Sequence, residues 1–408
     1  MTSDLQAQVA VVGAGPAGLT AALALSAVGA EVVVAAPPHA ADHGVADQRT
    51  TALLLGSLEM LRNLGVWELC ADQSTDLSGI RIVDDRGGIM RAPEILFCAA
   101  ELGLANFGAN IPNPPLVAAL RAAASKSPRL RWVPTAAVTK AVPSPDSVRL
   151  ELAEGGSLTA ALAVAADGRN SVVRAGAGIA AHTWRYPQAA IATSFSHTRP
   201  HDAITTELHR RAGPLTVVPL PGNQSSLVWV EAPPEAARLA ALDDAGFLGS
   251  LDRRLQGLLG ALSKPGPRAI YPLGGSSAER MAHNRVALVG EAAHVMPPIG
   301  AQGLNLGLRD AAVLADCVAD ARSRGRDVGS DGTLRAYCTA RAADVLTRSV
   351  SVDLLNRSLL TDFVPVQALR GLGLHVLANL APLRRLAMRG GLAPAGALPR
   401  LMRPGALP

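Results

Sequence analysis

The chain has 408 residues, of which 49% are hydrophobic and 17% charged, so it is long enough for two domains and too apolar to be intrinsically disordered. Its net charge of +5 arises from 38 basic and 33 acidic residues scattered along the sequence, which argues against nucleic acid as a partner. The four cysteines form no CxxC pair, which argues against a zinc site or a disulfide framework and suits a reducing, cytoplasmic compartment.

A run of 22 positions from Val9 to Ala30 carries no charged residue, and this is the length of a membrane span. Glycines and a proline break the run, however, and Asp4 stands where a signal peptide would carry a basic residue. We therefore predict a soluble α/β protein.

The broken run has the pattern of a dinucleotide-binding turn. A strand is predicted at Val9–Val12 and a helix at Leu19–Ala27, and GAGPAG lies between them. In such a turn Gly13 permits the tight bend, Gly15 lets the backbone approach a pyrophosphate, and Gly18 lets helix and strand pack closely. The alternative is a glycine turn without a ligand.

One part of this fingerprint is missing. An acid normally follows the second strand and binds the adenosine ribose, but Ala35 and Ala36 follow the strand predicted at Val32–Val34. Losing that hydrogen bond costs roughly 1 kcal/mol, which weakens binding without excluding it. Asp42 or Asp47 is a possible substitute, and the sequence does not choose between them.

Arg49 stands at the entrance to the next predicted helix, in which leucines recur at helical spacing from Leu54 to Leu64 and Gly65 ends the pattern. An arginine downstream of a dinucleotide turn can meet phosphate or flavin. A solvated surface arginine fits the pattern equally well.

Further elements follow before a second motif. Strands are predicted between residues 79 and 98 and at Arg129–Val133, Val148–Leu152 and Leu158–Ala166, with a helix at Asn113–Ser125. The last strand leads into Asp167 and Gly168, with basic residues behind them. An acid and a glycine at the carboxyl end of a buried strand suit ligand binding, although an aspartate that caps a helix or turn gives the same pattern.

The pattern of predicted elements changes between residues 182 and 273. Strand-like runs at Ala189–Phe195, Leu215–Leu220 and Ser226–Val230 are separated by glycine and proline pairs, and one helical stretch, Ala236–Leu262, interrupts them. We predict a mostly antiparallel β domain inserted into the dinucleotide-binding domain. Because aromatic residues make up only 3% of the chain, aliphatic side chains are expected to line the pocket beneath it.

A third motif begins with an apolar strand predicted at Val286–Val289, which Gly290 ends before Glu291. The loop that follows is rich in proline and glycine, and apolar residues recur at helical spacing from Leu304. The amides at the start of such a helix favour an anion or an electron-rich ring. Many α/β proteins have a similar turn with nothing bound.

The C-terminal segment has an unusual charge. The 46 residues after Asp362 contain six arginines and no acid. A short helix is predicted from Pro382, with Gly390 and Gly391 ending it. Such a segment suits the anionic inner face of a membrane, as a peripheral contact, and equally a capping helix with solvated arginines.

These patterns predict an order of domains. The dinucleotide-binding domain comprises residues 1–75, 101–178 and 281–345; the substrate domain comprises 76–100 and 179–280; and 346–408 is a C-terminal, helical, basic region.

Three segments together resemble a known family: GAGPAG at 13–18, ADGRNS at 166–171, and GEAAHVMPPIGAQGLNLGLRDA at 290–311. They are similar to those of the FAD-dependent aromatic hydroxylases (group A flavoprotein monooxygenases), and the whole chain looks most like the ubiquinone-biosynthesis hydroxylases. The resemblance implies a Rossmann-like FAD domain with FAD as cofactor and NAD(P)H as co-substrate.

The resemblance also implies roles for individual residues. Pro298 corresponds to the residue beside the reactive face of the flavin, Glu291 replaces the usual aspartate that binds the ribityl chain, and His294 is structural. The full set of implied cofactor contacts is Gly13, Gly15, Ala17, Gly18, Arg49, Asn113, Asp167, Gly168, Glu291, Gly300, Gly303, Leu304 and Asn305.

The implied reaction is hydroxylation of the aromatic ring of a polyprenylated phenol or quinol precursor by O₂, through a flavin hydroperoxide. Other quinone-biosynthesis proteins are possible partners. Three alternatives stay open: hydroxylation of a soluble aromatic, reduction of an isoprenoid double bond, and a non-catalytic scaffold. The ring carbon, the prenyl length, the choice of nicotinamide and the oligomeric state are not determined by the sequence.

Overall fold

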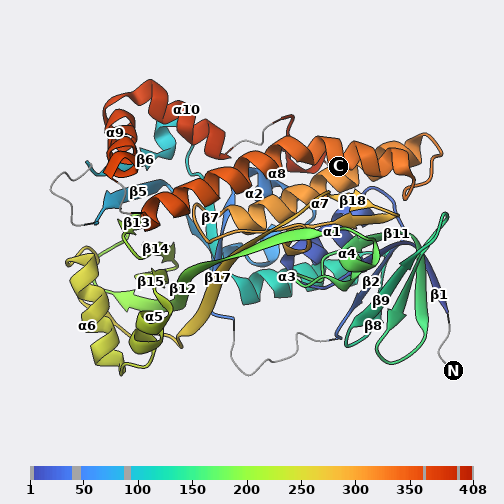
Figure 1. The fold of residues 1–408 in the computed structure, drawn as a ribbon, viewed down its shortest axis with the longest axis horizontal. Helices are drawn as coiled ribbons and strands as arrows, with labels where there is room; N and C mark the ends of the chain where they lie inside the picture. The colour runs from blue at the N-terminus through green and yellow to red at the C-terminus, as the bar shows by residue number, and fades with distance from the viewer. Residues whose placement is uncertain (1–3, 39–46, 87–92, 362–363, 393–395, 407–408) are drawn as a thin grey trace.

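The computed structural model describes residues 4–38, 47–86, 93–361, 364–392 and 396–406. Two large sheets lie side by side, and one long helix, α8 (Asp331–Leu360), runs across both of them (Figure 1). Within the described residues no helix is both long and apolar enough to cross a membrane. The mixed α/β architecture that the sequence predicts is confirmed.

The first sheet has a parallel centre. Its strands are β1 (Leu5–Val12), β2 (Val32–Ala36), β8 (Leu130–Pro134), β9 (Val138–Pro143), β10 (Val148–Leu152), β11 (Ser157–Ala165), β18 (Ala282–His283) and β19 (Val286–Leu288). In the described chain β1 pairs in parallel with β2 and β11, and these pair in parallel with β8 and β19, whereas β9, β10 and β18 are antiparallel. The central strands are buried on both faces, which explains their continuous apolar runs.

Helices cover this sheet on both sides. They are α1 (Pro16–Ala27), α3 (Asn113–Lys126), α4 (Val172–Gly176) and α7 (Gln302–Ser323). Helix α1 packs against both α3 and α7, and its small residues let it approach closely. Pro16 begins α1 at a position where the missing backbone N–H costs nothing. The Rossmann-like arrangement therefore brings the first and third sequence motifs to one end of the sheet.

The second sheet is mostly antiparallel. Its strands are β5 (Gly79–Asp84), β6 (Ile95–Cys98), β12 (Ala181–His197), β13 (Ile204–Arg210), β14 (Gly213–Leu220), β15 (Gln224–Glu231), β16 (Leu262–Ser263), β17 (Ala269–Ala278) and β20 (His294–Val295). Strand β13 pairs in parallel with β5. On one face Phe195, Trp229 and Phe247 anchor a separate apolar core under α5 (Pro233–Ala240) and α6 (Asp244–Leu255).

The single helical stretch predicted at Ala236–Leu262 is wrong. The chain forms α5 and α6 instead, because Asp243 accepts a hydrogen bond from the amide of Gly246 and so starts a new helix. Helix α6 ends where Gln256 takes the left-handed conformation, with φ of 52°. Leu262 already belongs to β16.

A small third sheet lies between the two larger ones. It consists of β3 (Thr50–Leu54), β7 (Gly108–Pro112) and β4 (Thr75–Asp76). Short helices adjoin it: α2 (Leu55–Asn63), η1 (Trp67–Leu69), η2 (Ala71–Gln73) and η3 (Ala99–Leu102). Asn110 donates from Nδ2 to the carbonyl of Pro219 at 2.9 Å, and Thr50 and Ser226 share a hydrogen bond of 2.9 Å. These contacts tie β14 to β7 and β15 to β3, the strand that Arg49 directly precedes.

The C-terminal segment forms α9 (Val364–Asn379), α10 (Ala381–Leu392) and η5 (Arg400–Met402). Helices α9 and α10 lie above β5 and β6 at one end of the molecule (Figure 1). The prediction that Gly390 and Gly391 end α10 is wrong, since both lie within the helix. The predicted domain boundaries stay a prediction, although β5 and β6 pair within the second sheet as they require.

Candidate FAD-binding site

The glycines of the first turn are placed where side chains would collide with the backbone. A Cβ on Gly13, which has φ of +106°, would lie 2.3 Å from the carbonyl oxygen of Ala166, and one on Gly18 would lie 2.2 Å from the carbonyl oxygen of Gly13. Gly15 differs, because it has extended backbone and, among the described residues, no atom within 4 Å of its Cβ position. Open space therefore adjoins Gly15, at the N-terminus of α1.

The second motif lies against this turn. Asp167 accepts hydrogen bonds at Oδ2 from the amides of Val172 and Val173, at 2.9 and 3.3 Å, so one carboxylate oxygen caps the start of α4. Its other oxygen, Oδ1, is buried and has no hydrogen-bond partner within the described chain. Gly168 has φ of +85° and open space around it. Helix capping thus explains one carboxylate oxygen of Asp167 and leaves the other available to a ligand.

The third motif crosses the first. A Cβ on Gly290 would lie 3.0 Å from the methyl group of Ala17, and one on Gly307 would lie 3.4 Å from the same methyl group. Helices α1 and α7 and the end of β19 therefore meet without space for larger side chains. Ala17 thus has a packing role, which the sequence did not predict.

The loop before α7 has an uncommon backbone. Gly300 and Ala301 are both left-handed, with φ of 64° and 54°. Helix α7 then begins at Gln302, two residues before the predicted Leu304. Pro298 and Gly303 are exposed, and Leu304 is half-buried against the first core. The amides of this first turn are therefore accessible beside an exposed proline.

Asn305 is buried and its side chain is fully engaged. Oδ1 accepts hydrogen bonds from the amide of Leu54 and the hydroxyl of Ser57, and Nδ2 donates to the carbonyls of Ala52 and Ala301. The side chain thus joins α7 to β3 and α2. Any contact of Asn305 with a ligand must come from its backbone.

Arg49 belongs to a polar group around the entrance. It forms a bidentate pair with Asp47, whose Oδ2 also accepts a hydrogen bond from Asn113 at 3.0 Å. The guanidinium lies 5.3 Å from the ring centre of Tyr271 on β17. The hydrogen bonds that Arg49 donates to Asp47 raise the pKa of Arg49, and Tyr271 and Glu291 act in the same direction.

One predicted cofactor contact, Glu291, is less constrained than the others. Glu291 has 54% of its side chain exposed, and its carboxylate lies 3.8 Å from Arg169, which is equally exposed. Of the two substitutes for the missing ribose acid, Asp42 lies outside the described residues, and Asp47 is already bound to Arg49 and Asn113.

Residues 6–349 match the family described as FAD binding domain. The chain belongs to this FAD binding domain family. Over 407 residues it is 37% identical to the ubiquinone hydroxylase UbiL of Rhodospirillum rubrum, covering 98% of this chain and 94% of the relative. It is 31% identical to the 3-demethoxyubiquinol 3-hydroxylase of Escherichia coli, covering 94% and 98% of the two chains. The predicted family and its FAD cofactor are confirmed.

Solved structures show the same fold as this FAD binding domain protein. The p-nitrophenol 4-monooxygenase PnpA of Pseudomonas putida superposes with a TM-score of 0.77 at 20% identity, covering 97% of this chain and all of that one. HpxO of Klebsiella pneumoniae, solved with FAD and uric acid, superposes with a TM-score of 0.72 at 18% identity, covering 96% and 97%.

The residues of this FAD binding domain protein fit the cofactor. A side chain on Gly15 would occupy the open space that a pyrophosphate needs beside the amides of α1. Asp167 keeps a buried oxygen without a partner next to the same turn. Arg49 and Arg169 add positive charge around the entrance. The open space and the helix amides suit the phosphates of the ligand, and the free carboxylate oxygen suits a hydroxyl or N–H donor on the same ligand.

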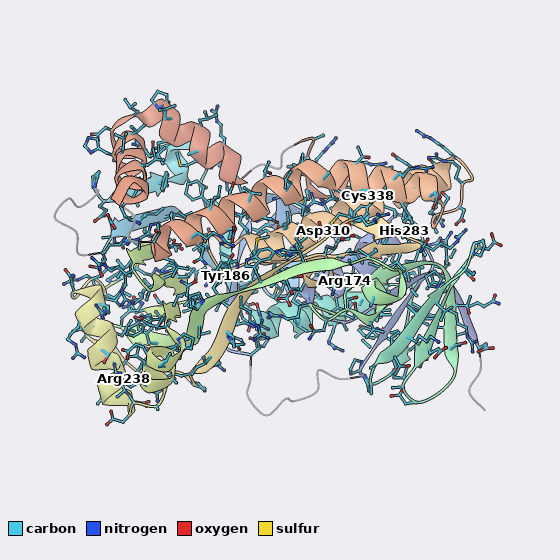
Figure 2. The ribbon with its side chains drawn as sticks, viewed as in Figure 1. Arg174, Tyr186, Arg238, His283, Asp310 and Cys338 are labelled. Carbon is cyan, nitrogen blue, oxygen red and sulfur yellow. The ribbon has the colours of Figure 1, made fainter. Side chains whose placement is uncertain are left out.

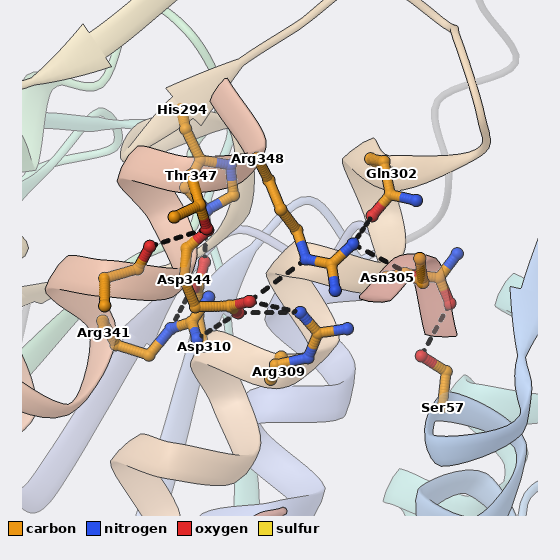
Figure 3. Close-up of polar contacts among 12 residues, drawn as sticks. Ser57, His294, Gln302, Asn305, Arg309, Asp310, Arg341, Asp344, Thr347 and Arg348 are labelled. Atoms are coloured by element: carbon orange, nitrogen blue, oxygen red, sulfur yellow. Dashed lines mark hydrogen bonds and ion pairs between the residues drawn. The ribbon is translucent and has the colours of Figure 1, made fainter. Parts of the chain in front are cut away.

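A buried ionic cluster between α7 and α8 supports the third motif on the side away from the open space. Asp310 accepts hydrogen bonds from the amide of Gly290, from Nε2 of His294 and from Nε of Arg341, at 3.0, 2.7 and 2.8 Å (Figure 3). Asp344 in turn accepts from Arg309, Arg341 and Arg348. His294 is therefore structural in this geometry, as expected. Figure 2 places Asp310 in the interior beneath α8.

Charge pairing keeps both acids ionised. Burial alone would raise the pKa of Asp310, but His294 and Arg341 outweigh burial and lower it. Burial likewise opposes ionisation of Asp344, and Arg309 and Arg341 lower its pKa strongly. Both carboxylates are therefore negative at neutral pH, and each balances a positive neighbour.

The sequence did not predict this cluster. The signal was present in α7, where two charged residues, Arg309 and Asp310, interrupt a run that is otherwise apolar from Leu306 to Ala312. Arg341, Asp344 and Arg348 are spaced three and four apart, as residues on one face of a helix are. Only the packing of α8 on α7 shows that the two sets meet.

Proposed function

We propose that this protein is an FAD-dependent monooxygenase that hydroxylates the aromatic ring of a polyprenylated phenol in ubiquinone biosynthesis, using NAD(P)H and O₂. The observation that carries this proposal is the 37% identity, over 98% of the chain, to a protein named as a ubiquinone hydroxylase. The substrate class rests on that name and on the name of the relative from Escherichia coli.

FAD, when bound, supplies the electron transfer and oxygen chemistry that ring hydroxylation requires. The residues proposed to hold it are Gly13, Gly15, Ala17, Gly18, Arg49, Asn113, Asp167, Gly168, Glu291, Gly300, Gly303, Leu304 and Asn305. Arg49 and the amides at the start of α1 provide positive potential for the phosphates.

The first turn of α7 provides a second positive end. Its amides, from Gln302 onward, stabilise negative charge that develops on the ring system beside Pro298. Asn305 ties this turn to its neighbours through four side-chain hydrogen bonds, two to β3, one to α2 and one to the carbonyl of Ala301. Strands β15 and β14 of the second sheet are tied to β3 and β7, and we propose that with flavin and substrate bound this sheet excludes water from the reacting ring.

Exposed apolar side chains on the C-terminal helices support a substrate that resides in lipid. On α8, Leu346 and Leu354 are 64% and 61% exposed, and with Val350 between them they form one helix face. The full exposed set on α8, α9, the turn after α9 and α10 is Leu346, Val350, Leu354, Leu369, Leu372, Leu380, Leu383 and Leu386. We name the seven leucines of this set the C-terminal leucines.

The tail arginines divide into two groups. Arg384 pairs with Glu101 at 2.8 Å, and Arg400 pairs with Asp316 and Asp320, so these two attach the tail to the body. Within the described chain Arg385, Arg389 and Arg403 are exposed and form no ion pair, while the side chain of Arg370 lies outside that description. Exposed leucines with nearby arginines suit the surface of an anionic bilayer, which would present the substrate.

One experiment tests the reaction. The purified protein, loaded with FAD, is supplied with NAD(P)H, ¹⁸O₂ and a polyprenylated phenol in vesicles, and mass spectrometry of the product should find a labelled oxygen atom on the ring. A product without label would exclude hydroxylation. Turnover of water-soluble phenols alone, with no binding to vesicles, would exclude the lipid substrate.

A variant tests the cradle. Gly15→Val should fold normally, because Gly15 has φ of −73° and open space around it, yet the new side chain should block the pyrophosphate. The variant should purify without flavin, and its far-ultraviolet spectrum should match that of the wild-type protein. Gly332→Val is the matched control, since Gly332 is exposed near the start of α8, its φ is not positive, and its Cβ position is also open. Normal flavin content in Gly15→Val would refute this placement.

A further inference from the structure

The turn that leads into α7 is held in a conformation that favours glycine. Ala301 carries a Cβ yet has φ of 54°, next to Gly300 with φ of 64°. A left-handed residue with a side chain costs free energy and persists only where its surroundings hold it. The brace is the side chain of Gln302, whose Nε2 donates to the carbonyl of Gly300 at 2.8 Å.

Arg348 on α8 holds Gln302 in turn. Its Nη1 donates to Oε1 of Gln302 at 2.6 Å, so one amide group joins the turn to a guanidinium (Figure 3). Arg348 is 9% exposed, and its Nε donates to Asp344 at 3.1 Å. The planar guanidinium is thus oriented by the buried cluster, and it has little freedom to follow Gln302 elsewhere.

The same guanidinium reaches the C-terminal helices. Nη1 also donates to the carbonyl of Gly391 at 3.1 Å, and Nη2 to the carbonyl of Gly390 at 3.4 Å. Both carbonyls belong to α10, which Arg384 attaches to Glu101 and to the end of α9. Arg348 therefore contacts the turn before α7, the buried cluster and α10 at once.

We propose that Arg348 is a positioning residue that transmits the placement of α10, through Gln302, to the Gly300–Ala301 turn at the candidate FAD site. The inference rests on the proposed function only in taking this turn to face the flavin. When α10 moves, the carbonyls held by Arg348 move with it, and the turn loses or gains its brace. A helix that carries C-terminal leucines thereby affects how firmly the flavin is held.

The first test compares three variants of the full chain. Arg348→Gln should weaken FAD binding about tenfold, because it removes a charged hydrogen bond to the brace. It should also raise the fraction of NAD(P)H electrons lost as hydrogen peroxide. Arg348→Lys should recover part of both effects. Arg335→Gln, an exposed position on the same helix, is the control and should change neither. Affinity is measured by fluorescence titration of flavin-free protein.

The second test asks whether the signal passes through α10 and Gln302. Gln302→Ala should reproduce the effect of Arg348→Gln, and Arg384→Gln, which detaches α10 from Glu101, should weaken FAD binding about threefold. In the Arg348→Gln background neither change should weaken binding further, since the connection is already broken. Independent, multiplying effects of the two substitutions would overturn the proposal.

A purely structural role would give a different result. Arg348→Gln would then lower the melting temperature of flavin-free protein while leaving the FAD dissociation constant and the peroxide fraction unchanged, and this outcome also overturns the proposal. Failure of the ring hydroxylation itself would leave the FAD titrations interpretable, because they require no substrate.

Discussion

Two regions of the molecule reverse the usual relation between polarity and burial. One is the interface between α7 and α8, and the other is the set of C-terminal helices. At the interface, Asp310, Arg341 and Asp344 are each at most 2% exposed and pair with one another. On the C-terminal helices, Leu369 is 71% exposed and Leu386 67%. Charges therefore lie in the interior of one region, and leucines lie at the surface of the other.

The difference shows that the side chains of the two regions are adapted to different environments. A buried charge costs free energy unless it is paired. The paired charges of the cluster lie directly behind the loop of the candidate FAD site, where they fix the positions of Gly290 and Gln302. An exposed leucine gains nothing in water, and so many on neighbouring helices mark a candidate interaction surface, which we propose to be a membrane contact. Arg348 joins the two regions.

The largest effect should come from opening the cluster. Asp344→Asn removes the negative charge that Arg309, Arg341 and Arg348 share, and leaving those cations underpaired should cost about 3–5 kcal/mol of folding free energy. Urea unfolding followed by circular dichroism measures it. The matched control, Glu235→Gln, breaks an exposed pair with Arg238 and should cost less than about 1 kcal/mol. Equal losses would show that burial of the cluster does not matter.

Acid should remove part of the same stabilisation. Since the folded-state pKa values of Asp310 and Asp344 are depressed, their contribution is complete above the ordinary carboxyl pKa, near 3.8, and is lost as the pH falls through the lower folded values. The wild-type protein should therefore lose more stability between pH 5 and about pH 3 than Asp344→Asn does. Denaturant unfolding at both pH values checks this. Parallel losses would contradict it.

The C-terminal leucines should respond to vesicles instead of denaturant. Replacing Leu346 and Leu354 by Gln should weaken partition into anionic vesicles by about 2 kcal/mol, roughly thirtyfold, because both side chains lose an apolar phase. Folding stability should hardly change, since both are exposed. Val142→Thr, on β9 at the far end of the molecule, is the control (Figure 1). Unchanged vesicle binding in the double variant would mean that these leucines do not face a membrane.

The sequence predicted elements well where a local pattern decided them. GAGPAG and the apolar runs around it placed β1, α1 and β2, because backbone and burial requirements there are set by neighbouring residues. The helix of residues 236–262 was mispredicted, because the break depends on the cap by Asp243, which periodicity does not register. Resemblance supplied Arg49 and Glu291, and only the structure showed Tyr271 and Asp47 beside Arg49.

The cluster marks the limit of such prediction. Asp310 and Arg341 are separated by 31 positions, and their pairing depends on how two helices pack. The sequence did indicate an apolar, basic tail, but it did not predict that Leu346 and Leu354 on α8 are exposed, since an apolar residue in a helix is normally assigned to the core. Prediction from sequence patterns assumes that apolar residues are buried and charged residues are exposed. The cluster and the leucines on α8 both depart from this assumption.

The smallest effect separates electrostatic attraction from leucine insertion at the C-terminal helices. Arg385→Gln should weaken binding to anionic vesicles by about 1 kcal/mol, roughly fivefold, and the loss should shrink as salt screens the surface. Arg149→Gln, an exposed arginine on β10 with the same change of charge, should have no effect if orientation rather than net charge governs docking. Equal losses in both variants would point to general attraction of a basic protein, and the leucines would then need another partner. A loss confined to Arg385→Gln, on neutral as well as anionic vesicles, would instead place the arginine within the helix packing that Arg384 and Arg348 maintain.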